Sequence, residues 1–171
     1  MESIKLSLIV PVYNVEMYIN RFLQSIDQNI MKGIEIIFVD DGSPDKCGEI
    51  LENYQLNNPE IIKVIHQKNK GVGAARNTGM IYSKGEYIAF VDPDDVLSED
   101  FVVQVLKGIT KFNYPDMLLF GQMRVEGGKA TKIKDYGIEG YIDISTILRD
   151  FANEKNVGNG LCNKVLKVSK C

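Results

Sequence analysis

The stretch that decides the fold is Gly85-Glu86-Tyr87-Ile88-Ala89-Phe90-Val91-Asp92-Pro93-Asp94-Asp95. It is a short apolar run, rich in aromatic and β-branched residues, that is followed by three carboxylates within four positions. Such a run predicts a buried strand over Tyr87–Val91, and Pro93 ends its ladder because proline has no backbone N–H. We therefore expect Asp92 and Asp94 to lie together at the carboxyl end of this strand.

Two interpretations of this acidic turn stay open on its residues alone. Asp and Pro are common in turns, so the segment can be an ordinary strand end. Alternatively, close carboxylates repel each other, and a hard divalent cation relieves that repulsion. Mg²⁺ and Mn²⁺ suit one or two carboxylates combined with the phosphate oxygens of a substrate. On this second interpretation, the turn predicts a site for a metal and a nucleotide.

Apolar runs and helix-period segments alternate over the first 120 residues. Strands are predicted at 6–12, 34–39, 61–65, 87–91 and 117–120. Helices are predicted between them, one of them running from about Ala74 to Tyr82, with Ser43 and Ser98 as expected N-caps of two others and Pro44 as a first helical residue. This rhythm predicts an α/β fold, Rossmann-like, with a mostly parallel sheet and helices on both faces.

Residues 121–171 have a different character. Met123–Val125 and Ala130–Ile133 predict a hairpin around Gly127-Gly128, and Ile144–Phe151 predicts a short helix. The tail that follows has no stop signal. We therefore divide the chain into a coherent α/β region, residues 1–120, and a second region, residues 121–171.

Composition excludes several classes of function. The chain has 171 residues and a net charge of −3, so it presents no basic field that would attract nucleic acid. Its three cysteines are widely spaced, which fits a reducing compartment better than a disulfide framework. No stretch reaches the length of a membrane helix. We expect a cytoplasmic protein whose association with a membrane, if any, is peripheral and at the inner face.

Polar, charged or aromatic residues that could bind a ligand follow several of the predicted strands. They lie at the edge of the sheet where open parallel sheets bind ligands. Asp40 and Asp41 follow the second strand. They can simply end that strand, or a carboxylate can accept the imide N–H of uracil or the hydroxyls of ribose. Tyr13, after the first strand, can pack or stack on a base. The edge therefore predicts a nucleotide site as one of two open alternatives.

The loop Asn69–Asn77 joins the third strand to the next helix and brings backbone amides and two cations to the same edge. Gly71-x-Gly73 is either a flexible connection or a phosphate-binding segment. It is a poor dinucleotide fingerprint, because Arg76 occupies the position of the third glycine. Arg76 itself is either a solvated helix residue or a partner for phosphate or carboxylate.

Taken in order, these motifs resemble those of the family 2 glycosyltransferases, inverting enzymes with the nucleotide-sugar-binding GT-A fold. The resemblance is dense over residues 4 to about 112. The matching segments are Ser7-Leu8-Ile9-Val10-Pro11-Val12-Tyr13-Asn14, Phe38-Val39-Asp40-Asp41-Gly42-Ser43-Pro44-Asp45, Asn69-Lys70-Gly71-Val72-Gly73-Ala74-Ala75-Arg76-Asn77-Thr78-Gly79 and the opening stretch Gly85–Asp95.

The resemblance implies a role for each motif. It makes residues 1–120 the region that binds a nucleotide sugar, with a UDP-sugar favoured. Asp94, with Asp92, would hold Mn²⁺ or Mg²⁺ at the diphosphate, and Asp92 would also reach the ribose. Asp41, more than Asp40, would accept the uracil imide hydrogen. The nucleotide-sugar-binding residues implied in this way are Pro11, Tyr13, Asn14, Asp40, Asp41, Lys70, Gly73, Arg76, Asn77 and Asp92.

The resemblance also implies an acceptor-side region, which residues 121–171 would begin and leave incomplete. In the family, the general base usually sits in an acidic pair that shortly follows a segment resembling Cys162-Asn163-Lys164-Val165-Leu166-Lys167. The only Glu-Asp pair here is Glu99-Asp100, which comes too early. We therefore expect a truncated acceptor half, with the catalytic base beyond Cys171. The acceptor would be a carbohydrate, a lipid-linked glycan or a glycoprotein.

Two other classes share single motifs with this chain. A receiver-type signalling domain also has a Val-Asp-Asp strand end and an acceptor aspartate, but its acidic strand comes first, whereas here a strand and a helix precede Val39-Asp40-Asp41. A haloacid dehalogenase-type phosphatase shares Phe90-Val91-Asp92-x-Asp94, but that motif should open the chain and continue with Gly-Thr. Both remain as alternatives to the glycosyltransferase.

Overall fold

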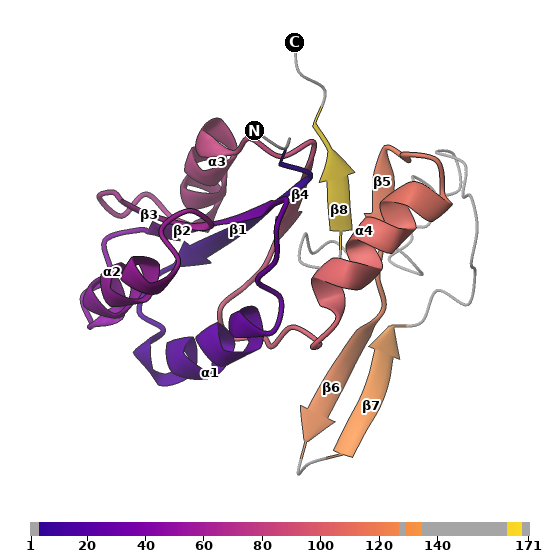
Figure 1. The fold of residues 1–171 in the computed structure, drawn as a ribbon. Coiled ribbons are helices and arrows are strands. Elements are labelled where there is room, and N and C mark those ends of the chain that lie inside the picture. The colour runs from indigo at the N-terminus through magenta and orange to yellow at the C-terminus, as the bar shows by residue number, and fades with distance from the viewer. Residues whose placement is uncertain (1–3, 127–128, 135–163, 169–171) are drawn as a thin grey trace.

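The computed structural model describes residues 4–126, 129–134 and 164–168, and Figure 1 draws it as a ribbon. Its main unit is a six-stranded sheet, accompanied by a separate two-stranded hairpin. The helices and strands, in chain order, are β1 Leu6–Val12, α1 Glu16–Asp27, β2 Ile34–Asp40, α2 Cys47–Asn57, β3 Ile62–His66, α3 Val72–Tyr82, β4 Tyr87–Phe90, α4 Phe101–Lys111, β5 Met117–Leu119, β6 Gln122–Glu126, β7 Lys129–Lys134 and β8 Lys164–Lys167.

The sheet has the strand order β3-β2-β1-β4-β8-β5. β1 pairs in parallel with β2 and with β4, and β2 pairs in parallel with β3, so the carboxyl ends of four neighbouring strands share one edge. β8 runs antiparallel to both of its neighbours. The predicted α/β fold with a mostly parallel sheet is confirmed.

β8 is the one strand of the sheet that the sequence analysis did not predict. It contributes only Lys164–Lys167, yet it lies between β4 and β5 (Figure 1). Val165 pairs with Ala89 on one side and Leu118 on the other, and it is 1% exposed. A strand from the second predicted region therefore completes the sheet of the first.

Helices cover both faces of the sheet, as predicted. On one face, alternate strand residues such as Leu8 and Val10 form the large core with α1, α2 and α4. On the other face, Ile37 and Val39 pack with Ala75 of α3. Strands buried on both faces explain the continuous apolar runs from which the sheet was predicted.

Gly79 sets the distance between α3 and the sheet. A Cβ atom at this position would clash with the side chain of Ile9 in β1. Because Gly79 is buried and helical, it lets the α3 backbone approach β1 more closely than any larger residue would. This contact fixes the helix that carries Arg76.

Three predicted helix starts need correction. α2 begins at Cys47 rather than Pro44, because Ser43 stays in a turn where its N–H donates to Asp40 Oδ1 at 2.9 Å. α4 begins at Phe101, and Ser98 forms no side-chain cap. α3 begins at Val72, two residues before the predicted start, so Gly73 is helical. In each case a local turn, not visible as periodicity, decides the boundary.

The predicted hairpin is confirmed in its two strands, because β6 pairs antiparallel with β7 from Glu126↔Lys129 outward. Its Gly127-Gly128 turn and the predicted helix Ile144–Phe151 lie outside the described residues. None of the helices in the described ranges is both long and apolar enough to span a bilayer.

Candidate functional site

A pocket of about 520 Å³ opens beyond the carboxyl ends of β1, β2 and β4. This is the edge where open parallel sheets bind ligands. Four segments that are far apart in the sequence supply its lining: Pro11, Val12, Tyr13, Val15, Asp41, Asn69, Gly71, Val72, Ala75, Arg76, Asp92, Pro93 and Asp94. The convergence predicted from the motif order is thus present in the fold.

Asp41 joins the second strand to the loop after β3. Its carboxylate is 2% exposed; Oδ1 accepts hydrogen bonds from Gln67 Nε2 at 2.7 Å and from the Lys70 N–H at 2.9 Å. Oδ2 accepts from the Gly71 N–H at 2.7 Å. Gly71 has φ +87°, a conformation that favours glycine. A carboxylate has about four acceptor positions, so the loop leaves about one of them for a ligand.

Gln67 is a residue that the sequence analysis missed. Its amide Nε2 donates to Asp41, while its Oε1 accepts from Thr78 Oγ1 at 2.6 Å. Because the carboxylate can only accept, it fixes which way the amide points, and the bond from Thr78 holds the Gln67 side chain in that orientation. A lone glutamine before the glycine loop carries no motif signal, and only the fold reveals its role.

Asp40 faces away from the pocket. Its Oδ1 accepts the Ser43 N–H, and its Oδ2 lies 2.9 Å from His66 Nδ1. The other ring nitrogen of His66 lies 3.2 Å from Glu52 Oε1. Asp40 is 6% exposed and does not line the pocket. Of the two adjacent carboxylates, Asp41 is therefore the one that a ligand in the pocket meets.

Arg76 pairs with Asp92 across the pocket. Its Nη2 donates to Asp92 Oδ1 at 2.8 Å, and the guanidinium carbon lies 5.9 Å from the centroid of the Phe90 ring. The Nε atom of Arg76 is buried and has no hydrogen-bond partner among the described residues. An unsatisfied buried donor is costly, and an oxygen acceptor that reached it would relieve that cost.

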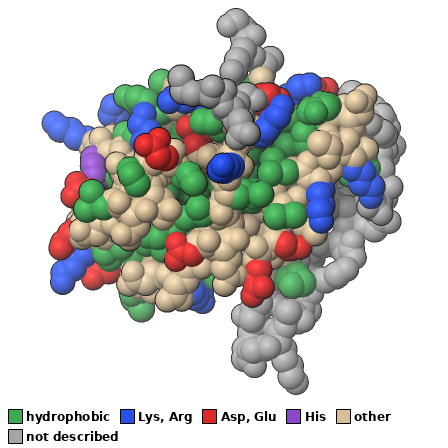
Figure 2. All heavy atoms as spheres, in the orientation of Figure 1, with side chains coloured by type: hydrophobic (Ala, Val, Ile, Leu, Met, Phe, Trp, Pro, Cys, Tyr) green, Lys and Arg blue, Asp and Glu red, His purple; other side chains and the backbone are tan. Residues whose placement is uncertain are grey.

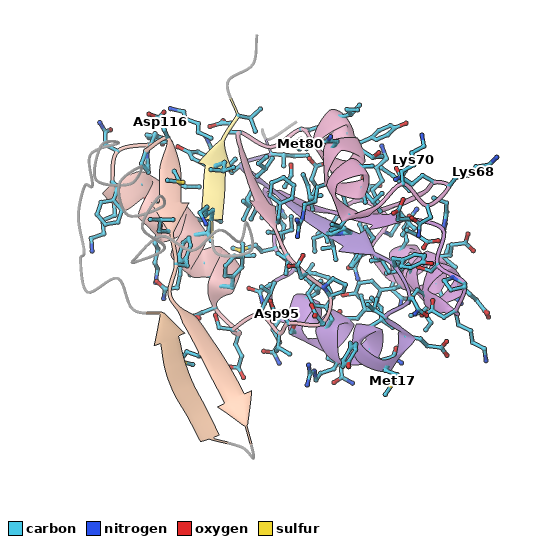
Figure 3. All side chains as sticks on the ribbon, turned by 180° about the vertical axis from the view of Figure 1, so that it is seen from behind. Met17, Lys68, Lys70, Met80, Asp95 and Asp116 are labelled. Atoms are coloured by element: carbon cyan, nitrogen blue, oxygen red, sulfur yellow. The ribbon has the colours of Figure 1, made fainter. Side chains whose placement is uncertain are left out.

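The acidic turn after β4 concentrates negative charge beside the pocket. The N–H of Asp95 donates to the carbonyl oxygen of Asp92 at 3.1 Å, and Arg21 Nη2 donates to the carbonyl oxygen of Asp94 at 3.0 Å. Figure 3 shows Asp95 beside α1. Partial burial, followed by the charges of Asp94 and Asp92, raises the pKa of Asp95. The turn therefore gathers charge that a cation would relieve.

A metal ion at this turn would need ligands beyond the side chains of the described residues. Within the described ranges, no three His, Cys, Asp or Glu side chains converge as metal ligands. Asp94 is exposed and lines the pocket, while one oxygen of Asp92 is engaged by Arg76. This donor set fits Mg²⁺ or Mn²⁺ bound by one or two carboxylates together with substrate phosphate oxygens.

The wall formed by the first strand is largely apolar. Pro11 is buried, and Tyr13 follows it with 48% of its surface exposed, which leaves the ring accessible. Val15 and Val72, which the sequence analysis did not single out, add apolar surface. The sequence did not mark them as pocket residues, because isolated valines are equally common in a hydrophobic core.

Several predicted site residues lie outside the pocket lining, namely Asn14, Asp40, Lys70, Gly73 and Asn77. Asn14 is exposed with φ +53°, and its N–H donates to Ser43 Oγ at 3.3 Å. Lys70 contributes its backbone N–H to Asp41, and Figure 3 shows it on the same outer loop as Lys68. Gly73 and Asn77 are exposed positions of α3.

Comparisons with known proteins agree with this site. The family model described as "Glycosyl transferase family 2" matches residues 7–170. The chain is 46% identical over 108 residues to "Putative glycosyltransferase EpsH" of Bacillus subtilis. The aligned region covers 63% of this chain and 31% of EpsH. The described fold defines a layered α/β protein with a pocket at the carboxyl edge of its sheet. The family match is specific: the chain belongs to glycosyltransferase family 2.

Solved structures support the same conclusion. The crystal structure of S. aureus TarS 1-349 in complex with UDP-GlcNAc is similar with a TM-score of 0.64 and 33% identity, covering 74% of this chain and 36% of that one. The mannosyltransferase PcManGT from Pyrobaculum calidifontis, in complex with GDP-Man and Mn²⁺, has a TM-score of 0.57 at 22% identity and shares the fold, covering 61% of this chain and 32% of that one. The chain spans about a third of the length of these relatives.

Family membership decides between the alternatives left open by the motifs. Neither the receiver domain nor the haloacid dehalogenase-type phosphatase is compatible with a family 2 match over residues 7–170. On the face shown in Figure 2, basic and acidic side chains are interspersed, so the described surface of that face has no large basic field.

Proposed function

We propose that this chain binds the donor of a metal-dependent, inverting glycosyltransferase reaction, and that the donor is a nucleotide diphosphate sugar, with UDP as the favoured nucleotide. The observation that carries the proposal is the single pocket in which Tyr13, Asp41, Arg76, Asp92 and Asp94 meet. Support comes from TarS, 33% identical, whose structure was solved with UDP-GlcNAc.

The nucleoside would occupy the side of the pocket between the first two strands. The exposed ring of Tyr13 offers a stacking surface for a planar base. Asp41 is held by N–H donors from Gln67, Lys70 and Gly71, and its remaining acceptor position suits the imide N–H of uracil. Adenine has an acceptor nitrogen at the comparable edge, so this carboxylate favours UDP over ADP.

The diphosphate would lie toward the acidic turn. Asp94 and Asp92 would hold Mn²⁺ or Mg²⁺ together with diphosphate oxygens, and Asp92 would also approach the ribose. When bound, such an ion supplies charge neutralisation for the departing diphosphate. Arg76 orients Asp92 through its Nη2, and its unsatisfied Nε suits an additional oxygen acceptor.

Transfer with inversion also needs a base that removes the proton of the acceptor hydroxyl while the donor carbon becomes oxocarbenium-like. The carboxylates that line the described pocket all have donor-side roles, since Asp41 holds the loop and Asp92 and Asp94 form the acidic turn. We therefore place the base outside the described residues. The range outside the described residues includes five carboxylates of this chain, which are Asp135, Glu139, Asp143, Asp150 and Glu154.

The remaining assignments are coarser. The acceptor is proposed to be a carbohydrate, a lipid-linked glycan or a glycoprotein, and the site of action the cytoplasm, at most peripheral to the membrane. The thiol of Cys47 is free, and burial raises its pKa to about 12, so it remains a thiol. An unreactive thiol is compatible with a reducing compartment.

Nucleotide selectivity tests the nucleoside part of this proposal. In calorimetric titrations with Mn²⁺ present, we expect UDP to bind more tightly than ADP. Asp41→Asn should weaken UDP binding by roughly five- to 150-fold, because its amide NH₂ group cannot accept, so that the Gly71 N–H and the uracil imide N–H can no longer both find an acceptor on this side chain. Equal affinity for UDP and ADP in the parent chain would contradict the proposed base recognition.

A further inference from the structure

The first turns of α1 and α2 are joined by reciprocal hydrogen bonds. The N–H of Glu16, the first residue of α1, donates to Asp45 Oδ2 at 2.9 Å. In return, the N–H of Lys46 donates to Glu16 Oε2 at 3.1 Å. The other oxygen of Asp45, Oδ1, accepts from the Cys47 N–H at 3.1 Å. We call this set of contacts between Glu16 and Asp45–Cys47 the helix clasp.

The helix clasp satisfies N–H groups that a helix start leaves without an intrahelical partner. Neither helix has a side-chain cap from its own N-cap residue, which is Val15 for α1 and Lys46 for α2. Each helix instead receives a carboxylate oxygen from the segment that leads into, or begins, the other helix. If the two helix starts move apart, these N–H groups must exchange their carboxylate partners for water.

The two segments that enter these helices both contribute to the lining of the pocket. Tyr13 lies three residues before Glu16, and Asp41 lies four residues before Asp45. The N–H of Asn14 donates to Ser43 Oγ at 3.3 Å, which is a further contact between the same two segments. The relative position of the Tyr13 ring and the Asp41 carboxylate is thus set on the strand side by the β1–β2 ladder and on the helix side by the helix clasp.

We propose that Glu16 and Asp45 are positioning residues for nucleotide recognition, which hold Tyr13 and Asp41 at the spacing that a base requires. The inference rests on the nucleoside site proposed above. It adds two residues that touch neither the pocket's base-recognising groups nor the acidic turn. Neither residue is in the lining of the pocket itself.

The chemistry of the two side chains predicts different responses to loss of charge. Asp45 uses both carboxylate oxygens as acceptors, whereas only Oε2 of Glu16 accepts a bond in the clasp. Asp45→Asn keeps the shape but turns one acceptor into an NH₂ group that faces an N–H donor. Glu16→Gln keeps one oxygen and can retain its bond. Asp45→Asn should therefore lose one of the three bonds of the clasp, and Glu16→Gln should keep all three.

The experiment measures UDP affinity of the full chain by calorimetry, with Mn²⁺ present. Asp45→Asn should weaken UDP binding by about fivefold, as expected for loss of a helix-cap bond that is fully coupled to the site. Glu16→Ala, which removes the acceptor for Lys46, should act in the same direction. Glu16→Gln should bind UDP within about twofold of the parent, the range of additive, uncoupled changes.

A matched control comes from the far ends of the same two helices. There Tyr54 of α2 donates its hydroxyl to Asp27 Oδ1 at 2.7 Å. Tyr54→Phe removes this contact between α1 and α2 while leaving the clasp intact. It should lower thermal stability without changing UDP affinity, which separates positioning from a general loss of stability.

A double-mutant cycle with Tyr13→Ala tests the mechanism. If the clasp acts through the ring, Asp45→Asn should change UDP affinity by no more than about twofold once the ring is gone. Equal losses in both backgrounds would overturn the proposal. So would parent-like UDP affinity in Asp45→Asn and Glu16→Ala, or the failure of both variants to fold, which would make the clasp a folding requirement.

Failure of this inference can be told apart from failure of the proposed function. A parent chain that does not bind UDP overturns both. A parent chain that binds UDP and loses affinity with Asp41→Asn, but not with Asp45→Asn or Glu16→Ala, overturns the positioning role alone.

Discussion

At the scale of single residues, the site depends on which carboxylates are engaged by the protein and which face the pocket. Asp41 and Asp92 are both fixed by N–H donors from neighbouring elements. Asp94 is exposed, and among the described residues its side-chain donor is Arg21, which binds the backbone carbonyl and not the carboxylate. This difference predicts that Asp92 and Asp94 respond differently to substitution.

Asp94→Ala should abolish the metal-dependent part of UDP binding and leave the fold intact. Removing its charge also relieves repulsion at the turn, since Asp94 is one cause of the raised pKa of Asp95. Asp92→Ala should in addition lower the free energy of unfolding by about 1 kcal/mol, because it leaves the partly buried guanidinium of Arg76 unpaired. Chemical denaturation and UDP titration with and without Mn²⁺ measure both effects.

The outcome that contradicts this assignment is specific. If Asp94→Ala binds UDP and Mn²⁺ as tightly as the parent chain, Asp94 is not a metal ligand. If Asp92→Ala is as stable as Asp94→Ala, the pair of Arg76 and Asp92 contributes little to the fold.

At the scale of elements, α3 connects the core to the pocket. Arg76 lies in the first half of this helix, and Gly79 packs against Ile9 one turn later. The position of the guanidinium therefore depends on how closely α3 approaches β1. Two glycines of α3, one in contact with the sheet and one not, allow this to be tested with a matched pair.

Gly79→Ala should destabilise the protein by roughly 1–3 kcal/mol, because the new methyl group overlaps Ile9 and the helix must shift. Gly73→Ala is the control: it lies in the same helix, has no atom within 4 Å of an added Cβ, and should be neutral or stabilising by up to about 1 kcal/mol. Thermal or chemical unfolding measures both. A Gly79→Ala variant as stable as Gly73→Ala would show that α3 accommodates the methyl group without strain.

Elements with continuous apolar runs could be predicted from sequence, whereas helix starts could not. The strands over residues 6–12 and 34–40 are buried on both faces, so most of their residues are apolar and carry the signal. The start of α2 depends instead on Asp45, whose burial would raise its pKa but whose hydrogen bonds with the N–H groups of Glu16 and Cys47 lower it. Because Glu16 belongs to another helix, a local sequence pattern could not indicate this contact.

At the scale of the whole molecule, β8 joins the two predicted regions. The predicted division at residue 120 assigns β8 to a different region from β4 and β5, yet β8 pairs with both strands in the structure. The four residues of β8 are too few to show a strand pattern, and their partners lie more than 40 positions away in the sequence. We propose that the donor-binding unit extends to include this strand.

Val165→Ala should therefore lower the free energy of unfolding by about 1–3 kcal/mol, since Val165 is 1% exposed and belongs to the main core. Lys167→Ala, at an exposed position of the same strand, should change it by no more than about 0.5 kcal/mol. Equal stability of the two variants would show that β8 contributes little to the fold in solution.

The pocket as a whole is proposed to bind a nucleotide and a divalent metal together. The measurement that tests this proposal most directly is a calorimetric titration of the 171-residue chain with UDP, with and without Mn²⁺. We predict that UDP binding requires Mn²⁺ or Mg²⁺, because the diphosphate oxygens and the Asp94 carboxylate would coordinate the ion together. UDP binding of equal affinity in the presence of a chelator, or no UDP binding with metal present, would contradict the account.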